Sequence, residues 1–338
     1  MSYKSPKWNN GSAPPLSAEN MQALTDAVQE QGETLATMCN PNMLDNWYFG
    51  KPVNQMGQTE WLSSASANIP CVDRWNWWGQ YAADATLKLS SDGLQLIGTA
   101  GVAGLYQGIS QKIEKDRLPV GATVTLSALV KAEADASIIL SMGGQNYVTV
   151  AVQANVWELI TFTSNAQSVE QTYDISIQRN TAGATFTVKA VKLELGSQQT
   201  LAHKENGVWV LNEIPKVSDQ LAKCQWYLQG IRPYNENYNG RYATFALGFA
   251  ESATVAAIYL VGRPSMRTKP VITAPGNFRV RFGGVVKAVT SLNLAAQEWT
   301  SGMFAMTANV SDGLTPGAGV TLQANNDETA NIFLSAEL

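Results

Sequence analysis

The stretch CVDRWNWWGQY, residues 71–81, places three tryptophans within four positions. Such a cluster is either a stacking platform for a ligand such as a sugar or an unusually heavy part of a core. Alternate side chains of a strand point to opposite faces, so Trp75 and Trp77 share one face and Trp78 takes the other. We therefore expect Trp75 and Trp77 to fill a core. Trp78, together with Tyr81, is either a packed residue or an exposed ligand contact.

Period-two alternation recurs along the chain and predicts half-buried strands. In ATVTLSALVKA (122–132) an apolar set alternates with a mostly polar set, and in YDISIQR (173–179) Asp174, Ser176 and Gln178 point outward. In ATFTVKAVKLEL (184–195) the inward apolar set shifts phase by one residue, from Phe186, Val188 and Ala190 to Val191, Leu193 and Leu195, which a β-bulge would produce. Further alternating runs follow residue 226, among them FRVRF.

These patterns predict a mainly β fold in which a short N-terminal helix precedes two antiparallel β-sandwich or jelly-roll domains. The expected divisions are an N-terminal attachment segment and helix, a jelly-roll sandwich, a connector, and a C-terminal β domain, at residues 1–38, 39–196, 197–225 and 226–338.

The N-terminal helix carries a narrow apolar seam. Its positions are spaced by three and four residues and include one polar member: Met21, Leu24, Val28, Gln31, Leu35 and Met38. This spacing is typical of a coiled coil. A helix this short is marginal alone in water, so we expect copies of the chain to pack together, although a helix lying on its own domain would show a similar stripe.

Composition limits the function classes. The net charge is −4, only 15% of residues are charged, and no Lys/Arg run occurs, which disfavours nucleic-acid binding. No stretch resembles a signal peptide or an apolar membrane span, so we expect synthesis in the cytoplasm and no membrane insertion. The odd count of three cysteines suggests neither a disulfide framework nor a zinc site.

Catalytic and metal signatures are weak. The chain has a single histidine, His203, with no matching nucleophile motif, and we expect it to be a solvated loop residue. Scattered carboxylates leave a glycan depolymerase as a minor alternative. We expect no cofactor and no metal site.

A second aromatic stretch, RPYNENYNGRY (232–242), mixes tyrosine with asparagine. Tyrosine supplies rigid contact area and asparagine supplies hydrogen bonds, as in adaptable recognition surfaces. Its candidate ligand contacts are Tyr234, Asn235, Tyr238, Asn239 and Tyr242. The alternative is a long hairpin loop that packs on its neighbour.

Several stretches together resemble bacteriophage and prophage tail-fibre proteins. NMLDNWYF with DRWNWW (42–78) resembles the opening of their jelly-roll module, and VKLELGSQQT (191–200) resembles its closing strand. LAKCQWYLQGI (221–231) and GRPSMRTKPVI (262–272) resemble motifs of their C-terminal domains. Trp226 and Leu228 depart from that pattern, which blurs the roles of those side chains.

The resemblance implies a non-enzymatic virion component, usually a homotrimer, whose N-terminus binds other phage structural proteins and whose β domains adhere to a host-cell-surface glycan. The leading hypothesis is thus a tail fibre or receptor-binding protein, made in the bacterial cytoplasm and located in the virion. A head fibre or capsid-decoration protein would have the same parts. A carbohydrate-binding module of a secreted enzyme is disfavoured by the missing signal peptide and catalytic domain.

Overall fold

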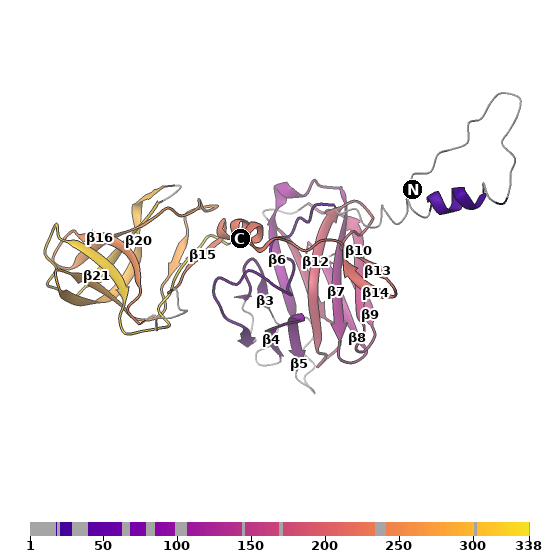
Figure 1. Ribbon diagram of the computed structural model, residues 1–338, viewed down its shortest axis with the longest axis horizontal. Helices are drawn as coiled ribbons and strands as arrows, with labels where there is room; N and C mark the ends of the chain where they lie inside the picture. Colours follow the sequence, from indigo (N-terminus) through magenta and orange to yellow (C-terminus); the bar gives the residue numbers. More distant parts are fainter. Residues whose placement is uncertain are drawn as a thin grey trace, which may run out of the picture.

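The computed structural model describes residues 18, 21–28, 40–62, 68–78, 85–98, 107–143, 146–168, 172–233, 241–300 and 303–337, without the side chains of 296–300. The chain is mainly β and its sheets are antiparallel, which confirms the predicted fold class. Figure 1 shows two β units, with the connector between them.

The first unit is a sandwich of two six-stranded sheets. The β12 sheet has the order β1 (Glu60–Leu62), β4 (Ala85–Ser90), β5 (Gly93–Gly98), β12 (Phe186–Leu195), β7 (Thr123–Ala132), β10 (Trp157–Asn165). The β11 sheet has the order β2 (Ile69–Pro70), β3 (Asn76–Trp78), β6 (Gly108–Glu114), β11 (Thr172–Arg179), β8 (Ala136–Met142), β9 (Asn146–Val152). One short 3-10 helix, η1 (Lys115–Arg117), follows β6.

The sandwich core is built from the inward apolar sets that the alternation predicts. Val124, Leu126, Ala128 and Val130 of β7 are fully buried. The opposite face of β7 differs from the expected half-buried strand, because Thr125, Ser127 and Leu129 are buried as well. The chain after β12 contributes to this cover: Thr125 donates to the carbonyl of Gly196 at 2.7 Å, and partly buried Trp209 and Leu211 pack against the sandwich core.

The predicted phase slip in β12 is a β-bulge at Lys189. Val188 pairs with Val130, but Ala190 pairs with Leu129, so one residue is left over. The bulge lies where the strand partner on the second edge of β12 changes. Phe186–Val188 pairs with β5 there, and the residues after the bulge pair with the segment 42–49. Leu195, expected to point inward, is 49% exposed because it ends the strand.

The closing strand is polar on one side for a structural reason. Glu194 and Lys192 are fully buried. The Glu194 carboxylate accepts hydrogen bonds from the backbone N–H and the hydroxyl of Thr200, at 2.7 and 2.5 Å. Lys192 Nζ lies 3.4 Å from Glu213. These contacts fix the following hairpin, β13 (Ala202–Glu205) and β14 (Val208–Leu211), against the sandwich.

The second unit follows the helix α2 (Val217–Gln225). A three-stranded sheet has the order β15 (Leu228–Ile231), β23 (Ile332–Ser335), β18 (Val271–Thr273). Six further strands close into a barrel rather than two separate sheets: β16 (Thr244–Ala250), β17 (Val255–Val261), β21 (Met303–Val310), β20 (Val285–Thr300), β19 (Phe278–Phe282) and β22 (Gly319–Ala324). Barrel and small sheet share one core.

In the N-terminal segment the structure has helix at residues 21–28. The seam residues Met21, Leu24 and Val28 are 51%, 48% and 61% exposed, so this stripe does not pack on the two β units. Gln31, Leu35 and Met38 lie outside the described residues. Within the described ranges, no helix has the length and apolar character needed to span a membrane.

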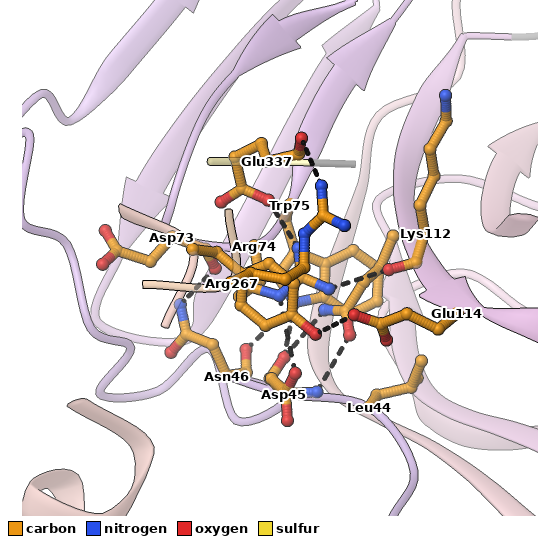
Figure 2. Close-up of polar contacts among 12 residues, drawn as sticks. Leu44, Asp45, Asn46, Asp73, Arg74, Trp75, Lys112, Glu114, Arg267 and Glu337 are labelled. Atoms are coloured by element: carbon orange, nitrogen blue, oxygen red, sulfur yellow. Dashed lines mark hydrogen bonds and ion pairs between the residues drawn. The ribbon is translucent and has the colours of Figure 1, made fainter. Parts of the chain in front are cut away.

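The two β units are joined around Arg74, whose side chain is 1% exposed (Figure 2). Its guanidinium pairs with Glu337, which follows β23, and with Asp45 at 3.4 Å. It donates to the carbonyl of Lys112 at 2.8 Å and lies 3.4 Å from the ring centroid of Tyr227, whose hydroxyl donates to Glu114 at 2.6 Å. We call Asp45, Arg74, Glu114, Tyr227 and Glu337 the Arg74 cluster.

Electrostatics favour the charged form of Arg74 in this cluster. Burial by itself would lower the pKa of Arg74, but Glu337, Tyr227 and Asp45 raise it above its ordinary value. The backbone of Arg74 has φ 71°, a left-handed conformation that is uncommon outside glycine and is kept only where the surroundings fix it. The burial and partners of Arg74 supply that fixation.

Gln55 makes a second connection between the units. Its backbone and side-chain N–H groups donate to Asp73 at 2.8 and 2.6 Å, and its side-chain oxygen accepts from the backbone of Gly230 at 3.1 Å. Its amide also donates to the carbonyl of Leu228 at 2.6 Å. Burial raises the pKa of Asp73 to about 6, although the hydrogen bonds from Gln55 oppose that shift.

We predict that Arg74→Gln destabilises the protein by about 3–5 kcal/mol, because Glu337 and the buried Asp45 lose their common cation. Urea unfolding followed by tryptophan fluorescence measures the change. Arg281→Gln, at an exposed position on β19, is the matched control and should shift the free energy of unfolding by no more than about 0.5 kcal/mol. Equal unfolding midpoints for the two variants would contradict the role assigned to Arg74.

Candidate functional site

A hollow of about 270 Å³ opens on the outer face of the β11 sheet. The side chains that line it are mostly hydroxyls and amides, with one aromatic ring and one charge of each sign: Asn68, Trp78, Ser110, Lys112, Ser141, Asp174, Ser176 and Gln178. They come from four neighbouring strands and from the residue before β2. Segments far apart in the sequence therefore build one surface.

The strand β3 divides the three tryptophans as the alternation predicts. Trp77 is fully buried between the sheets, whereas Trp78 is partly exposed on the outer face. Trp75 precedes the strand and is buried: its indole N–H donates to the carbonyls of Asp45 and Asn46, at 3.2 and 3.1 Å, and its ring meets Phe49 edge-on. The ligand role expected for Trp78 stays a prediction. Tyr81 lies outside the described residues.

Gly108 lies in β6 at a point where the strands approach closely. It pairs with Trp78 on one side and with Gln178 on the other, so these three positions form one row across the sheet. A Cβ at Gly108 would lie 2.1 Å from the carbonyl oxygen of Ile177, which leaves no room for a larger residue.

The neighbouring row of the floor is made of serines. Ser110 pairs with Ser176, and Ser176 pairs with Ser141. The Ser176 hydroxyl accepts a hydrogen bond from Gln178 at 2.6 Å, which leaves its own proton to donate. Small hydroxyl side chains thus give the floor hydrogen-bonding capacity without filling it.

The charges of the hollow oppose each other across one strand pair. Lys112 of β6 faces Asp174 of β11. Partial burial raises the pKa of Asp174, and the charge of Lys112 acts against that shift. Because no direct ion pair joins the two described side chains, both retain hydrogen-bonding capacity for a ligand.

Strand alternation in the sequence indicated four of the eight residues that line the hollow. The alternation of residues 173–179 correctly turned Asp174, Ser176 and Gln178 outward, and that of β3 separated Trp78 from Trp77. The pattern missed the other four, Asn68, Ser110, Lys112 and Ser141, since no local pattern shows that β6 lies between β3 and β11 or that β8 follows. Outward polar residues on each predicted strand were the available signal.

The second aromatic stretch is described at one of its candidate residues. Tyr242 is 44% exposed, and its hydroxyl donates to Asn326 at 3.3 Å. The Arg279 guanidinium lies 4.3 Å from its ring centroid. Tyr234, Asn235, Tyr238 and Asn239 lie outside the described residues. Tyr242 is on the second unit, so it does not contribute to the hollow.

His203 lies in β13, not in a loop as expected. Its ring nitrogens contact Asn212 Oδ1 at 2.5 Å and Glu205 Oε1 at 2.9 Å. The hydrogen bonds to Asn212 and Glu205 raise the pKa of His203. These contacts link His203 of β13 to Glu205 in the same strand and to Asn212 directly after β14. Among the described residues, no three His, Cys, Asp or Glu side chains gather as metal ligands would.

Comparison with protein-family models found no match, and neither did a search of curated proteins. Carbohydrate-binding modules are among the solved structures similar to this chain. A CBM4 structure is 20% identical over 39% of this chain and 92% of its own, with a TM-score of 0.29. The CBM22-1-CBM22-2 tandem domain of Paenibacillus barcinonensis Xyn10C is 12% identical over 81% and 97%, with a TM-score of 0.29. TmCBM61 in complex with β-1,4-galactotriose is 18% identical over 36% and 88%, with a TM-score of 0.27. These likenesses are too distant to carry an argument about ligand or role.

Proposed function

We propose that the chain is an adhesion protein that binds a glycan in the hollow on the β11 sheet. The observation that carries the proposal is the position of Trp78, a partly exposed indole beside a floor of hydroxyl and amide groups. A sugar ring has an apolar C–H face that suits an aromatic surface and hydroxyls at its edge that suit short polar side chains. Pockets that combine apolar area with a few convergent polar groups are typical ligand sites.

The lining favours binding over hydrolysis. Glycoside hydrolysis uses a pair of carboxyl groups on either side of the scissile bond. Among the described lining residues Asp174 is the one carboxylate, and the facing charged group is Lys112. A non-enzymatic role therefore accounts for this set of side chains better than a depolymerase does.

The wider role is proposed from the sequence resemblance: a tail fibre or receptor-binding protein of a bacteriophage or prophage virion. In this proposal the apolar seam joins three copies, because Met21 and Leu24 need a partner to leave water. The N-terminal region then attaches to other phage structural proteins, and the β units face the host. A head fibre has the same parts, so immunogold labelling of the virion decides between tail and head, and label on neither would refute the virion role.

We predict that Trp78→Ala weakens glycan binding at least tenfold, since a central aromatic contact commonly contributes about 2 kcal/mol or more. The measurement is an array of immobilised bacterial-surface oligosaccharides, followed by calorimetric titration of the strongest binder. Trp157→Ala is the matched control, because Trp157 lies in the β12 sheet, against Lys131 and Lys189. Unchanged binding by Trp78→Ala, or an equal loss in both variants, would refute the assignment of the hollow.

A further inference from the structure

We infer that the ligand is an uncharged glycan that lies across the strands of the β11 sheet as an extended chain, from Trp78 to a second aromatic contact at Tyr147. The inference rests on the proposed function and adds the ligand's form, charge and direction. It is argued from the cross-strand register, the hydroxyl groups of the floor and the balance of charge.

The register places one continuous row of polar side chains across the sheet. Asn76 pairs with Ser110, Ser110 with Ser176, Ser176 with Ser141, and Ser141 with Tyr147. Directly paired residues of antiparallel strands lie on the same face. The row therefore crosses from β3 to β9 on the face that carries the hollow, next to the row that begins at Trp78.

Tyr147 is a candidate end contact because of where this row places it. It is 61% exposed on β9, the last strand of the sheet, while its partner Ser141 is 4% exposed at the floor of the hollow. A single exposed aromatic residue means little alone. Tyr147 does not line the hollow itself, but its pairing with Ser141 places it on the same face, on the side of the sheet opposite Trp78.

The floor between the two rings has hydroxyl groups that can bond to a ligand. Ser141 is 4% exposed and lines the hollow, so its hydroxyl can face a ligand there. A ligand hydroxyl over the row would bond to it, and Ser176 beside it still has a proton to donate.

The span sets the size of the ligand. Four strand-to-strand steps separate β3 from β9, and at about 4.8 Å a step the distance is about 19 Å. Because a sugar ring extends over about one such step, roughly 5 Å, a chain of about four rings reaches from one aromatic residue to the other. A single terminal sugar would contact only one of them.

The charges favour an uncharged chain. Lys112 and Asp174 are the charged residues of the described lining, they face each other, and their formal charges cancel. An acidic sugar attracted by Lys112 would also be repelled by Asp174. A basic sugar attracted by Asp174 would be repelled by Lys112. Sugar hydroxyls can donate to the carboxylate and accept from the ammonium group.

The test uses the full-length protein and a chain-length series of the glycan that gives the strongest Trp78-dependent signal on the array. Fragments of one to six rings are titrated by calorimetry. Affinity should rise up to about four rings and then level off. Tyr147→Ala should weaken binding of the four-ring fragment about tenfold and leave that of the two-ring fragment unchanged, whereas Trp78→Ala weakens both. Phe249→Ala, which removes an exposed aromatic ring from the other unit, should change neither.

The outcomes separate the two proposals. Absence of any Trp78-dependent binder refutes glycan binding in the hollow itself. Trp78-dependent binding that does not increase beyond two rings, or that Tyr147→Ala leaves unchanged for every fragment, refutes the extended chain alone. A strongest binder that carries an acidic sugar and loses affinity when that carboxylate is reduced refutes the uncharged ligand. Circular dichroism and unfolding midpoints confirm that each variant is folded.

Discussion

The burial of one guanidinium, that of Arg74, is the constraint on which the rest of the structure depends. A charge this deeply buried is costly unless it is paired and hydrogen-bonded, and Arg74 obtains its partners from distant parts of the chain. Glu337 comes from beyond β23, Asp45 from the segment before β1, and Tyr227 from the connection after α2. The ion pairs and the ring contact of one side chain therefore join the sandwich to the C-terminal unit.

The same residue also determines how β3 is presented. Arg74 lies two positions before the strand, with φ 71°, and its guanidinium is bonded to the backbone of β6, the neighbour of β3. Because Arg74 holds the chain just before β3, strand alternation places Trp77 in the core and Trp78 on the outer face of the sheet, paired with Gly108. Lys112 connects the two regions directly, because its carbonyl accepts from Arg74 while its side chain lines the hollow. Interdomain packing and the candidate site thus share their framework.

How much of this could be predicted from the sequence follows from the range of each interaction. Alternation is local, so it indicated the strands, the bulge in β12 and the outward direction of Asp174, Ser176 and Gln178. The pairing of Arg74 with Glu337 spans 263 residues and leaves no periodic trace. Likewise, Lys192 and Glu194 look like solvated positions of a half-buried strand, but they are buried and contact Glu213 and Thr200, on either side of the following hairpin.

The central claim is that of the three clustered tryptophans only Trp78 faces a ligand. Fluorine NMR of protein labelled with fluorotryptophan tests it most directly, with the ten tryptophan signals assigned by single substitution. Titration with the bound oligosaccharide should shift the Trp78 signal and leave those of Trp75 and Trp77 in place, since both are buried. A silent Trp78 signal at saturating oligosaccharide would contradict the account.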